Sequence, residues 1–111
     1  MIRQEDIVMC ISKSGETPEV KALVPILSGL GNTMIAMVSK AQSYLGTNAT
    51  YVLHTPIDKE ADPNNLAPTS STAVQLAMGD AFAMSLQVAR GFTAKDFAQY
   101  HPGGALGKQL Y

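Results

Sequence analysis

The 111-residue sequence contains no tryptophan, one cysteine and few charged residues. With Cys10 alone an internal disulfide is excluded, and its place in an apolar segment predicts a small, buried side chain. The formal net charge is −1 and only 15% of residues are charged, which excludes the broad basic surface of nucleic-acid-binding domains. An anionic ligand must therefore be held by local dipoles and hydroxyl groups.

Long apolar segments are also missing. No run reaches the length of a membrane-spanning helix, and residues 1–6 do not resemble the apolar part of a secretory signal. We therefore expect a cytoplasmic protein that does not contact membranes. The two histidines lie far apart in the sequence and the acids are scattered, so we expect neither a metal site nor a cofactor.

An alternation of apolar strands and helices is what the sequence does contain. Continuously hydrophobic segments are typical of buried strands in parallel sheets, and we expect such strands over 7–11, 33–38 and 51–54. We expect helices over 18–30, stopped by Gly31, near Ser43 and Leu45, and from the hydroxyl cluster at 70–72 to Gly91. A further helix should run from Thr93, which with Asp96 resembles a capping box, to about Tyr100, and the glycine-rich turn at 103–107 should break it and start another. This order predicts a single α/β domain with a parallel sheet.

The segment 73–90 is apolar around most of the expected helix, rather than along one stripe. Such a helix is either central in its own domain or packed against another subunit. Together with the low charge of the chain, this predicts a homo-oligomer, either a dimer or a tetramer.

The segment 11–20 contains the clearest functional signal. An apolar strand ends at three hydroxyl residues around a glycine, and Pro18 then stands at the first position of a helix with Thr17 as its N-cap. The free N–H groups and dipole of a helix N-terminus attract anions, and a glycine lets the backbone approach a ligand. These features predict a phosphate site at Ser12, Ser14, Gly15 and Thr17. Ordinary strand-to-helix turns use the same residues, so the local chemistry alone leaves both interpretations open.

Three motifs resemble those of a known family. The run Ser12-Lys13-Ser14-Gly15-Glu16-Thr17 resembles the S-x-S-G-E-T phosphosugar loop of SIS (sugar isomerase) domains. Residues 66–72 (LAPTSST), and 89–97 (ARGFTAKDF) followed by 101–107 (HPGGALG), narrow the resemblance to the SIS domain of bacterial D-arabinose-5-phosphate isomerases. The resemblance extends over essentially the whole sequence.

The resemblance implies a parallel-sheet sandwich of the SIS type, a flavodoxin-like three-layer αβα fold. It implies interconversion of D-arabinose 5-phosphate and D-ribulose 5-phosphate, in the synthesis of Kdo for lipopolysaccharide or capsule. Family members begin with helices and a first strand, followed by a Gly-x-Gly-Lys-Ser-Gly turn whose lysine lines the active site. This sequence contains no such segment. We therefore expect residues 1–111 to form the C-terminal part of one SIS domain, without its first strand and helices and without CBS modules.

Aldose–ketose isomerisation moves a proton between adjacent carbons through an enediol(ate), which requires acid–base groups. The resemblance implies this role for Glu19, Glu60 and His101. The residues themselves also allow other interpretations: Glu19 suits the first turn of any helix, Glu60 suits a solvated position between other acids, and His101 suits a helix end. We interpret Glu16 as a residue that organises the loop and takes no part in proton transfer.

Two other functions stay open. An SIS module that senses a phosphosugar without converting it needs the same loop but no acid–base residues. A 3-hexulose-6-phosphate isomerase shares the fold and the loop type, although the His-Pro-Gly-Gly context favours the arabinose-type enzyme. A folded segment without activity is a third possibility, because the lysine-containing turn is missing.

Overall fold

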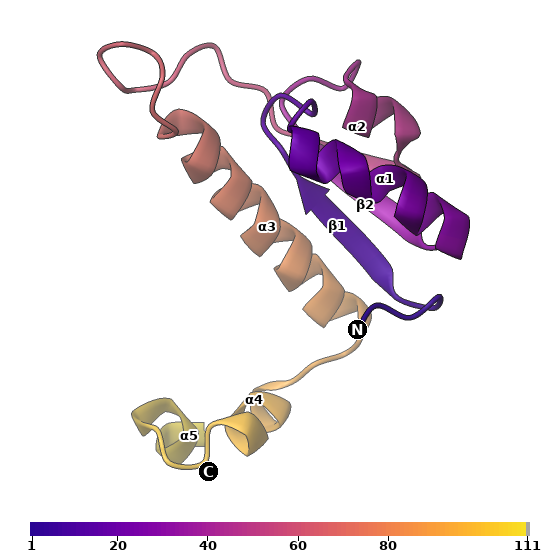
Figure 1. The fold of residues 1–111 in the computed structure, drawn as a ribbon. Helices are drawn as coiled ribbons and strands as arrows, with labels where there is room; N and C mark the ends of the chain where they lie inside the picture. The colour runs from indigo at the N-terminus through magenta and orange to yellow at the C-terminus, as the bar shows by residue number, and fades with distance from the viewer. Residues whose placement is uncertain (111) are drawn as a thin grey trace. The chain divides into compact units, whose positions relative to one another are not determined.

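The structure is a computed structural model that describes residues 1–110, and it divides into two compact units, Met1–Met78 and Gly79–Tyr111 (Figure 1). The first unit contains all of the strands described for the chain and two short helices. The second contains two further helices, and helix α3 (Ser70–Ala89) runs across the boundary.

A three-stranded parallel sheet forms the centre of the first unit. Strands β1 (Ile7–Ile11), β2 (Thr33–Val38) and β3 (Tyr51–His54) lie in that order, with β2 in the middle. Ile7 pairs with Thr33 and Ile35 pairs with Tyr51. The predicted parallel strands and the α/β class are confirmed, with the predicted strand bounds.

Helices α1 (Pro18–Leu30) and α2 (Tyr44–Asn48) both contact β2. As predicted, α1 begins with a proline and stops at Gly31, which has a left-handed φ of 79°. There the Gly31 amide donates to the Ser28 carbonyl and the Asn32 amide donates to the Leu27 carbonyl, so the last turn is capped. The Ser43 hydroxyl caps α2 by accepting a bond from the Gly46 amide.

The core of the first unit lies between these helices and one face of the sheet. Its buried members are Cys10, Val24, Leu27, Met34, Ala36, Val38 and Leu45. Cys10 is buried, as predicted, and this burial raises the pKa of its thiol. Because side chains alternate along a strand, Val8 and Cys10 share the face that packs on this core.

The prediction that the 7–11 strand is buried is wrong for two of its residues. Ile7 and Ile11 are 65% and 50% exposed, whereas the residues of the central strand β2 are nearly all buried. The reason is that β1 is an edge strand of the described sheet, and both isoleucines lie on the face opposite to the core formed with α1.

In the second unit, α4 (Ala94–Tyr100) contacts α5 (Ala105–Leu110). The predicted capping box is present, since the Thr93 hydroxyl accepts from the Asp96 amide and the Asp96 carboxylate accepts from the Thr93 amide. Gly107 lies so close to the His101 carbonyl that any Cβ at this position would overlap it. Because α4 ends at Tyr100 and α5 begins at Ala105, the glycine-rich segment separates two helices, as predicted.

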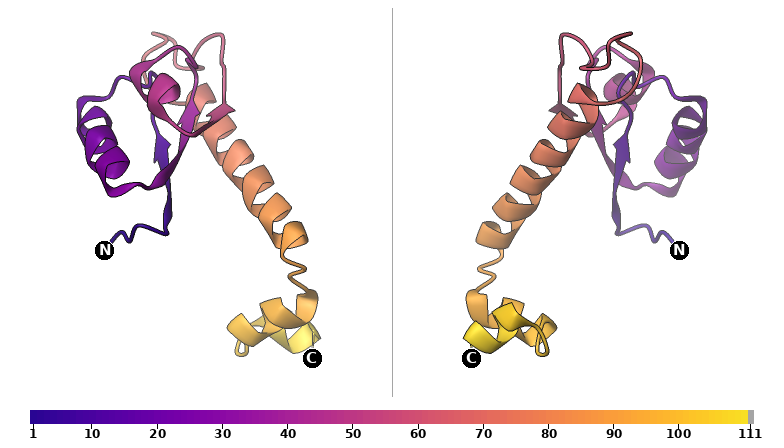
Figure 2. Two further views of the ribbon diagram at one scale, coloured as in Figure 1. Left: turned by 90° about the vertical axis from the view of Figure 1, so that its right-hand side faces the viewer. Right: turned by 90° about the vertical axis from the view of Figure 1, so that its left-hand side faces the viewer.

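Helix α3 begins at the predicted hydroxyl cluster and ends just before Gly91. Its apolar residues Leu76, Leu86 and Val88 are exposed, so the covering of this helix by another subunit stays a prediction. Among residues 1–110, no helix combines the length and the hydropathy needed to cross a bilayer. Figure 2 shows the course of α3 from two further directions.

Candidate phosphosugar site

The candidate site lies at the edge of the sheet where the three parallel strands end. The 12–17 loop follows β1, Ser39 and Lys40 follow β2, and Thr55 follows β3. The Ser39 amide donates to the Lys13 carbonyl at 2.9 Å, and the Ser39 hydroxyl donates to the Thr55 carbonyl at 2.8 Å. These bonds hold the three strand ends together at the edge where ligands bind in open α/β sheets.

The four predicted phosphate-binding residues lie together, and their hydroxyls bond within the loop. The buried Ser12 hydroxyl accepts from the Gly15 amide at 3.0 Å and lies 2.7 Å from the Thr17 hydroxyl oxygen. The exposed Ser14 hydroxyl accepts from the Glu16 amide at 3.1 Å. A hydroxyl that accepts one bond can still donate its own proton, so Ser14 is placed to donate to a ligand.

Two details of the sequence-based prediction need correction. Thr17 occupies the N-cap position of α1, but its side chain makes no capping bond, because it pairs with Ser12 instead. The amides of Gly15 and Glu16 are not free for a ligand, because the neighbouring serine hydroxyls accept from them. The loop is therefore preformed by its own side chains.

Gly15 and Glu16 attach the loop to the start of α2. Gly15 is buried with a φ of 70°, and a Cβ there would overlap the Ser43 side chain. The Glu16 carboxylate accepts from the Tyr44 amide at 2.7 Å and from the Lys21 ammonium at 3.0 Å. These contacts, with the Tyr44 amide as the largest cause, lower the pKa of Glu16. They agree with our interpretation of Glu16 as an organising residue.

Glu60 is buried, with 1% of its side chain exposed, so its interpretation as a solvated acid is wrong. Its carboxylate accepts from the Ser71 amide at 2.8 Å, the Ser71 hydroxyl at 2.7 Å and the Lys13 ammonium at 3.1 Å. The Ser71 amide and hydroxyl, more than Lys13, lower the pKa of Glu60 to about 2. The carboxyl is therefore ionised at pH 7, and as a base it is weak.

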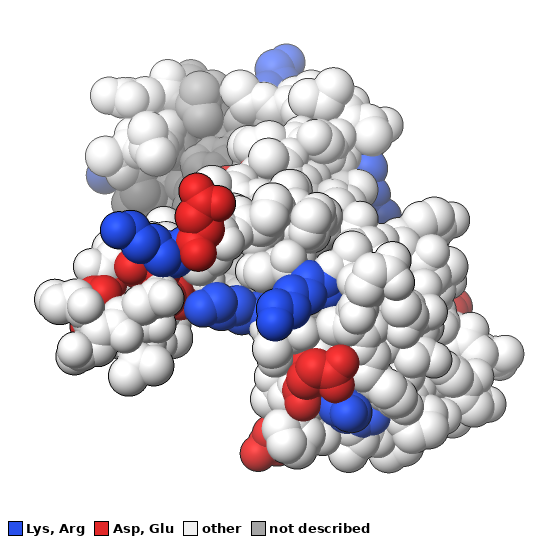
Figure 3. All heavy atoms as spheres, turned by 90° about the horizontal axis from the view of Figure 1, so that it is seen from above, with Lys and Arg blue, Asp and Glu red and all other residues white. Residues whose placement is uncertain are grey.

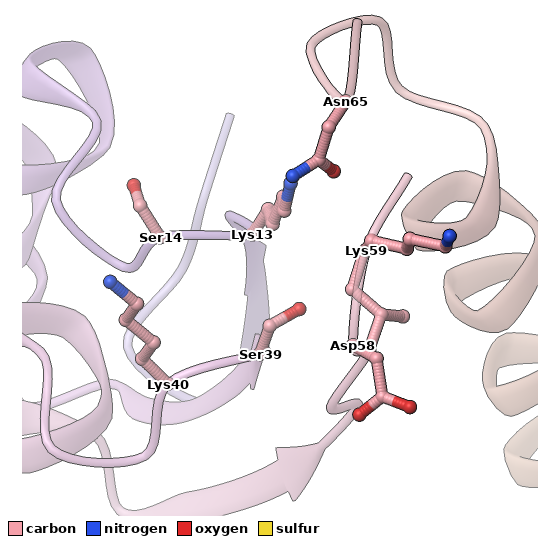
Figure 4. Close-up of a pocket in the computed structure, with 8 residues that line it drawn as sticks. Lys13, Ser14, Ser39, Lys40, Asp58, Lys59 and Asn65 are labelled. Carbon is pink, nitrogen blue, oxygen red and sulfur yellow. The ribbon is translucent and has the colours of Figure 1, made fainter. Parts of the chain in front are cut away.

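A pocket of about 420 Å³ opens beside the loop (Figure 4). Its lining residues are Lys13, Ser14, Ser39, Lys40, Ile57, Asp58, Lys59 and Asn65. The sequence analysis did not select any of these lysines. A usable signal was present, because Lys13 lies inside the loop motif and Lys40 lies two residues after the end of β2, at the same edge of the sheet.

The charged side chains on the face drawn in Figure 3 are of mixed sign. In the view of Figure 3, lysine and arginine side chains lie close to acidic ones and do not cover the face continuously. In the described residues, no group of three or more His, Cys, Asp or Glu side chains is arranged to hold a metal ion.

Glu19 and His101 occupy different units. Glu19 is exposed in the first turn of α1, two residues after Thr17 and next to the loop. His101 caps the C-terminus of α4, where its Nδ1 lies 2.9 Å from the Phe97 carbonyl oxygen and its ring stacks on Phe97 with 4.1 Å between centroids. The first unit thus holds Glu19, Glu60 and the loop, and His101 belongs to the second.

Comparisons with known proteins, by family model and by sequence, both identify SIS-domain proteins as similar to this chain. A family model for the SIS domain matches residues 1–85. The chain is 52% identical to a probable arabinose 5-phosphate isomerase of Haemophilus influenzae and 50% identical to the arabinose 5-phosphate isomerase KdsD of Pseudomonas aeruginosa. Each match covers 99% of this chain but only 33% and 34% of the relatives, so the chain spans about a third of their length.

A solved structure of the Escherichia coli CFT073 protein c3406, in complex with arabinose 5-phosphate, is similar to this chain. The TM-score is 0.87 and the sequence identity is 39%. The similarity covers 91% of this chain and 54% of that one.

Replacing Gly15 tests whether the loop depends on its close contact with Ser43. We expect Gly15→Ala to destabilise the protein by about 2–4 kcal/mol, because it combines a left-handed backbone with overlap in a packed site. Urea unfolding measures the effect. The matched control is Gly29→Ala in α1, where a Cβ meets nothing within 4 Å and the change should be neutral or slightly stabilising. Equal stability of the two variants would contradict the proposed role of the contact.

The depressed pKa of Glu60 predicts how stability depends on pH. A carboxyl with a pKa of about 2 when folded and an ordinary value of 4.5 contributes its full stabilisation above pH 4.5, and loses it as the pH falls toward 2. We expect Glu60→Gln to be less stable at pH 7 and to lose less stability than the wild type between pH 5 and pH 3. Urea midpoints at several pH values measure this, with exposed Glu5→Gln as the control. A Glu60→Gln profile parallel to the wild type would refute the prediction.

Proposed function

The chain belongs to the SIS domain family, and we propose that it is the phosphosugar-binding part of an aldose–ketose isomerase acting on D-arabinose 5-phosphate and D-ribulose 5-phosphate. The observation that carries this proposal is the match to arabinose 5-phosphate isomerases over nearly the whole chain. The preformed hydroxyl loop beside a pocket of suitable size supports it. We propose that this reaction supplies Kdo for lipopolysaccharide or capsule, which is the role that the family resemblance implies.

The loop fixes the end of the substrate that does not react. Ser14 donates to the phosphate, while Ser12, Gly15 and Thr17 hold the loop in shape. Binding of the remote phosphate restrains the sugar, so that its first two carbons meet the acid–base groups in a constant position. Such positioning lowers the entropic part of the barrier.

The chemical step requires a base that removes the proton from C2 of the aldose and an acid that returns a proton to C1. The hydroxyl protons must also move, from O2 to O1. Glu19 is an exposed carboxylate beside the loop and suits the base. Glu60 is less suited to removing a proton than the family resemblance implies, because the hydrogen bonds that lower its pKa also make its carboxylate a weaker base.

His101 is arranged for exchange of protons through one nitrogen. The Phe97 carbonyl can only accept, so Nδ1 carries the proton in this contact. The neutral ring then has its lone pair on Nε2, and stacking on Phe97 restricts the ring plane. This fixed tautomer supports a role for Nε2 as the acid–base group for the substrate oxygens.

The two compact units belong to one SIS domain in this proposal. Their boundary falls inside the continuous helix α3, whereas separate domains are normally joined by exposed, flexible linkers. The exposed apolar residues of α3 support the accompanying proposal of a homo-oligomer. We also propose that the protein acts in the cytoplasm.

A direct assay tests the isomerase. We expect the full-length protein that contains this chain to convert D-arabinose 5-phosphate to D-ribulose 5-phosphate, and we would assay the 111-residue chain in parallel. Binding of the phosphosugar without turnover would support the sensor instead. Turnover of 3-hexulose 6-phosphate alone would support the related isomerase.

Replacing His101 separates its chemical role from its role as a helix cap. Asparagine can still donate from its amide to the Phe97 carbonyl, but it has no equivalent of Nε2. We expect His101→Asn to lower kcat by about 10²–10⁴-fold, with little change in KM and in thermal stability. Wild-type turnover in this variant would leave His101 as a cap only.

A further inference from the structure

We propose that Lys13 and Lys40 bind the phosphate group of the phosphosugar, and that Glu60 is the positioning residue that holds Lys13 for this task. The inference rests on the proposed function, because it takes a phosphosugar as the ligand. It goes beyond the hydroxyl loop in assigning the positive charge of the site to two lysines and a buried carboxylate.

Lys13 is held from one side only. Its Nζ lies 3.1 Å from Glu60 Oε2, and the Lys13 side chain is 45% exposed while that of Glu60 is 1% exposed. An ammonium has three N–H donors, so this contact leaves two of them for the pocket that Lys13 lines. Figure 4 shows the Lys13 side chain extending along the pocket toward Asn65.

Glu60 is an unusually rigid partner for a surface lysine. An exposed ion pair normally gains little, because two long side chains must be ordered to form it. Here the carboxylate is already fixed by the amide and hydroxyl of Ser71, and the Glu60 amide donates to the Asn65 side chain at 2.7 Å. Only the lysine remains to be ordered, so the ammonium is placed before a ligand arrives.

The ion pair with Glu60 leaves part of the Lys13 ammonium available to a ligand. The Glu60 carboxylate also accepts hydrogen bonds from Ser71 and Thr69, so Lys13 is only one of its donors. The two partners nevertheless have opposite charges, and a dianionic phosphate needs a further cation. That cation is Lys40.

Lys40 lies on the other side of Ser14 in the pocket. In Figure 4 its side chain extends toward Ser14, the loop residue whose hydroxyl is placed to donate to a ligand. Within residues 1–110 Lys40 forms no ion pair. The remaining charges of the lining, Lys59 and Asp58, are opposite in sign and adjacent in sequence. Lys13 and Lys40 therefore supply the positive charge on either side of Ser14.

The overall charge of the chain makes this local arrangement necessary. The formal net charge is −1, so long-range attraction does not bring a phosphate to the site. Lys13 and Lys40, which line the pocket together with Ser14, attract a phosphate bound there. Salt screens such short-range attraction least.

The test measures ligand affinity by calorimetry in the full-length protein. We expect Lys13→Met and Lys40→Met each to weaken binding of D-arabinose 5-phosphate and of inorganic phosphate by roughly tenfold. KM should rise while kcat stays near the wild-type value. Arg3→Met removes the same charge at the opposite end of β1, where Arg3 is exposed beside Glu5, and should leave both affinities unchanged.

Glu60 is tested through its partner. We expect Glu60→Gln to weaken phosphate binding about as much as Lys13→Met, and to cause no further loss when both changes are combined. If the Lys13–Glu60 ion pair only stabilises the fold, Glu60→Gln and Lys13→Met will lower the unfolding temperature and leave the affinity for phosphate unchanged. Thermal melts of each variant identify loss of fold, and Lys13→Arg should restore much of the affinity.

The outcomes separate this inference from the proposed function. Unchanged affinity in folded Lys13→Met and Lys40→Met overturns the inference, even if the protein is an active isomerase. Lysine-dependent binding of inorganic phosphate in a protein without turnover overturns the isomerase and leaves the inference standing.

Discussion

The buried carboxylate of Glu60 imposes the strongest constraint on the site. A charge removed from water is costly unless donors surround it, so the chain must bring hydrogen-bond partners to this one point. They come from two regions that are distant in sequence: Lys13 after β1, and Thr69 and Ser71 around the start of α3. The hydrogen bonds to this one carboxylate therefore fix the 12–17 loop, the 55–69 loop and the start of α3 in relation to each other.

A second attachment acts on the other side of the loop. Gly15 fits against Ser43, and Glu16 holds the Tyr44 amide. The loop is thus attached both to α2 and, through Lys13, to Glu60. A loop fixed in this way loses little entropy when a phosphate binds, which is the benefit of preorganisation. In the conformation that these attachments hold, the amides of Gly15 and Glu16 are already bonded to the loop's own serines.

The sequence was sufficient to predict most of the elements, because local signals determine them. The apolar runs gave the bounds of β2 and β3, and the Thr93 and Asp96 pair gave the start of α4. The exposure of Ile7 and Ile11 was not predictable, because an apolar run does not show which face of a sheet is covered. The burial of Glu60 was missed for a related reason: neighbouring acids suggested solvent, while its main partners lie 11 and 47 residues away.

The position of Cys10 has a consequence for the study of this protein's motions. The thiol lies on β1 just before the loop, is 7% exposed, and has a raised pKa because of burial. Alkylating agents react with the thiolate, and burial both blocks their access to Cys10 and disfavours its thiolate form. Modification therefore requires the helix layer to separate from the sheet. Cys10 is the one cysteine in the described residues. Its rate of labelling under native conditions therefore measures how often α1 separates from the sheet beside the 12–17 loop.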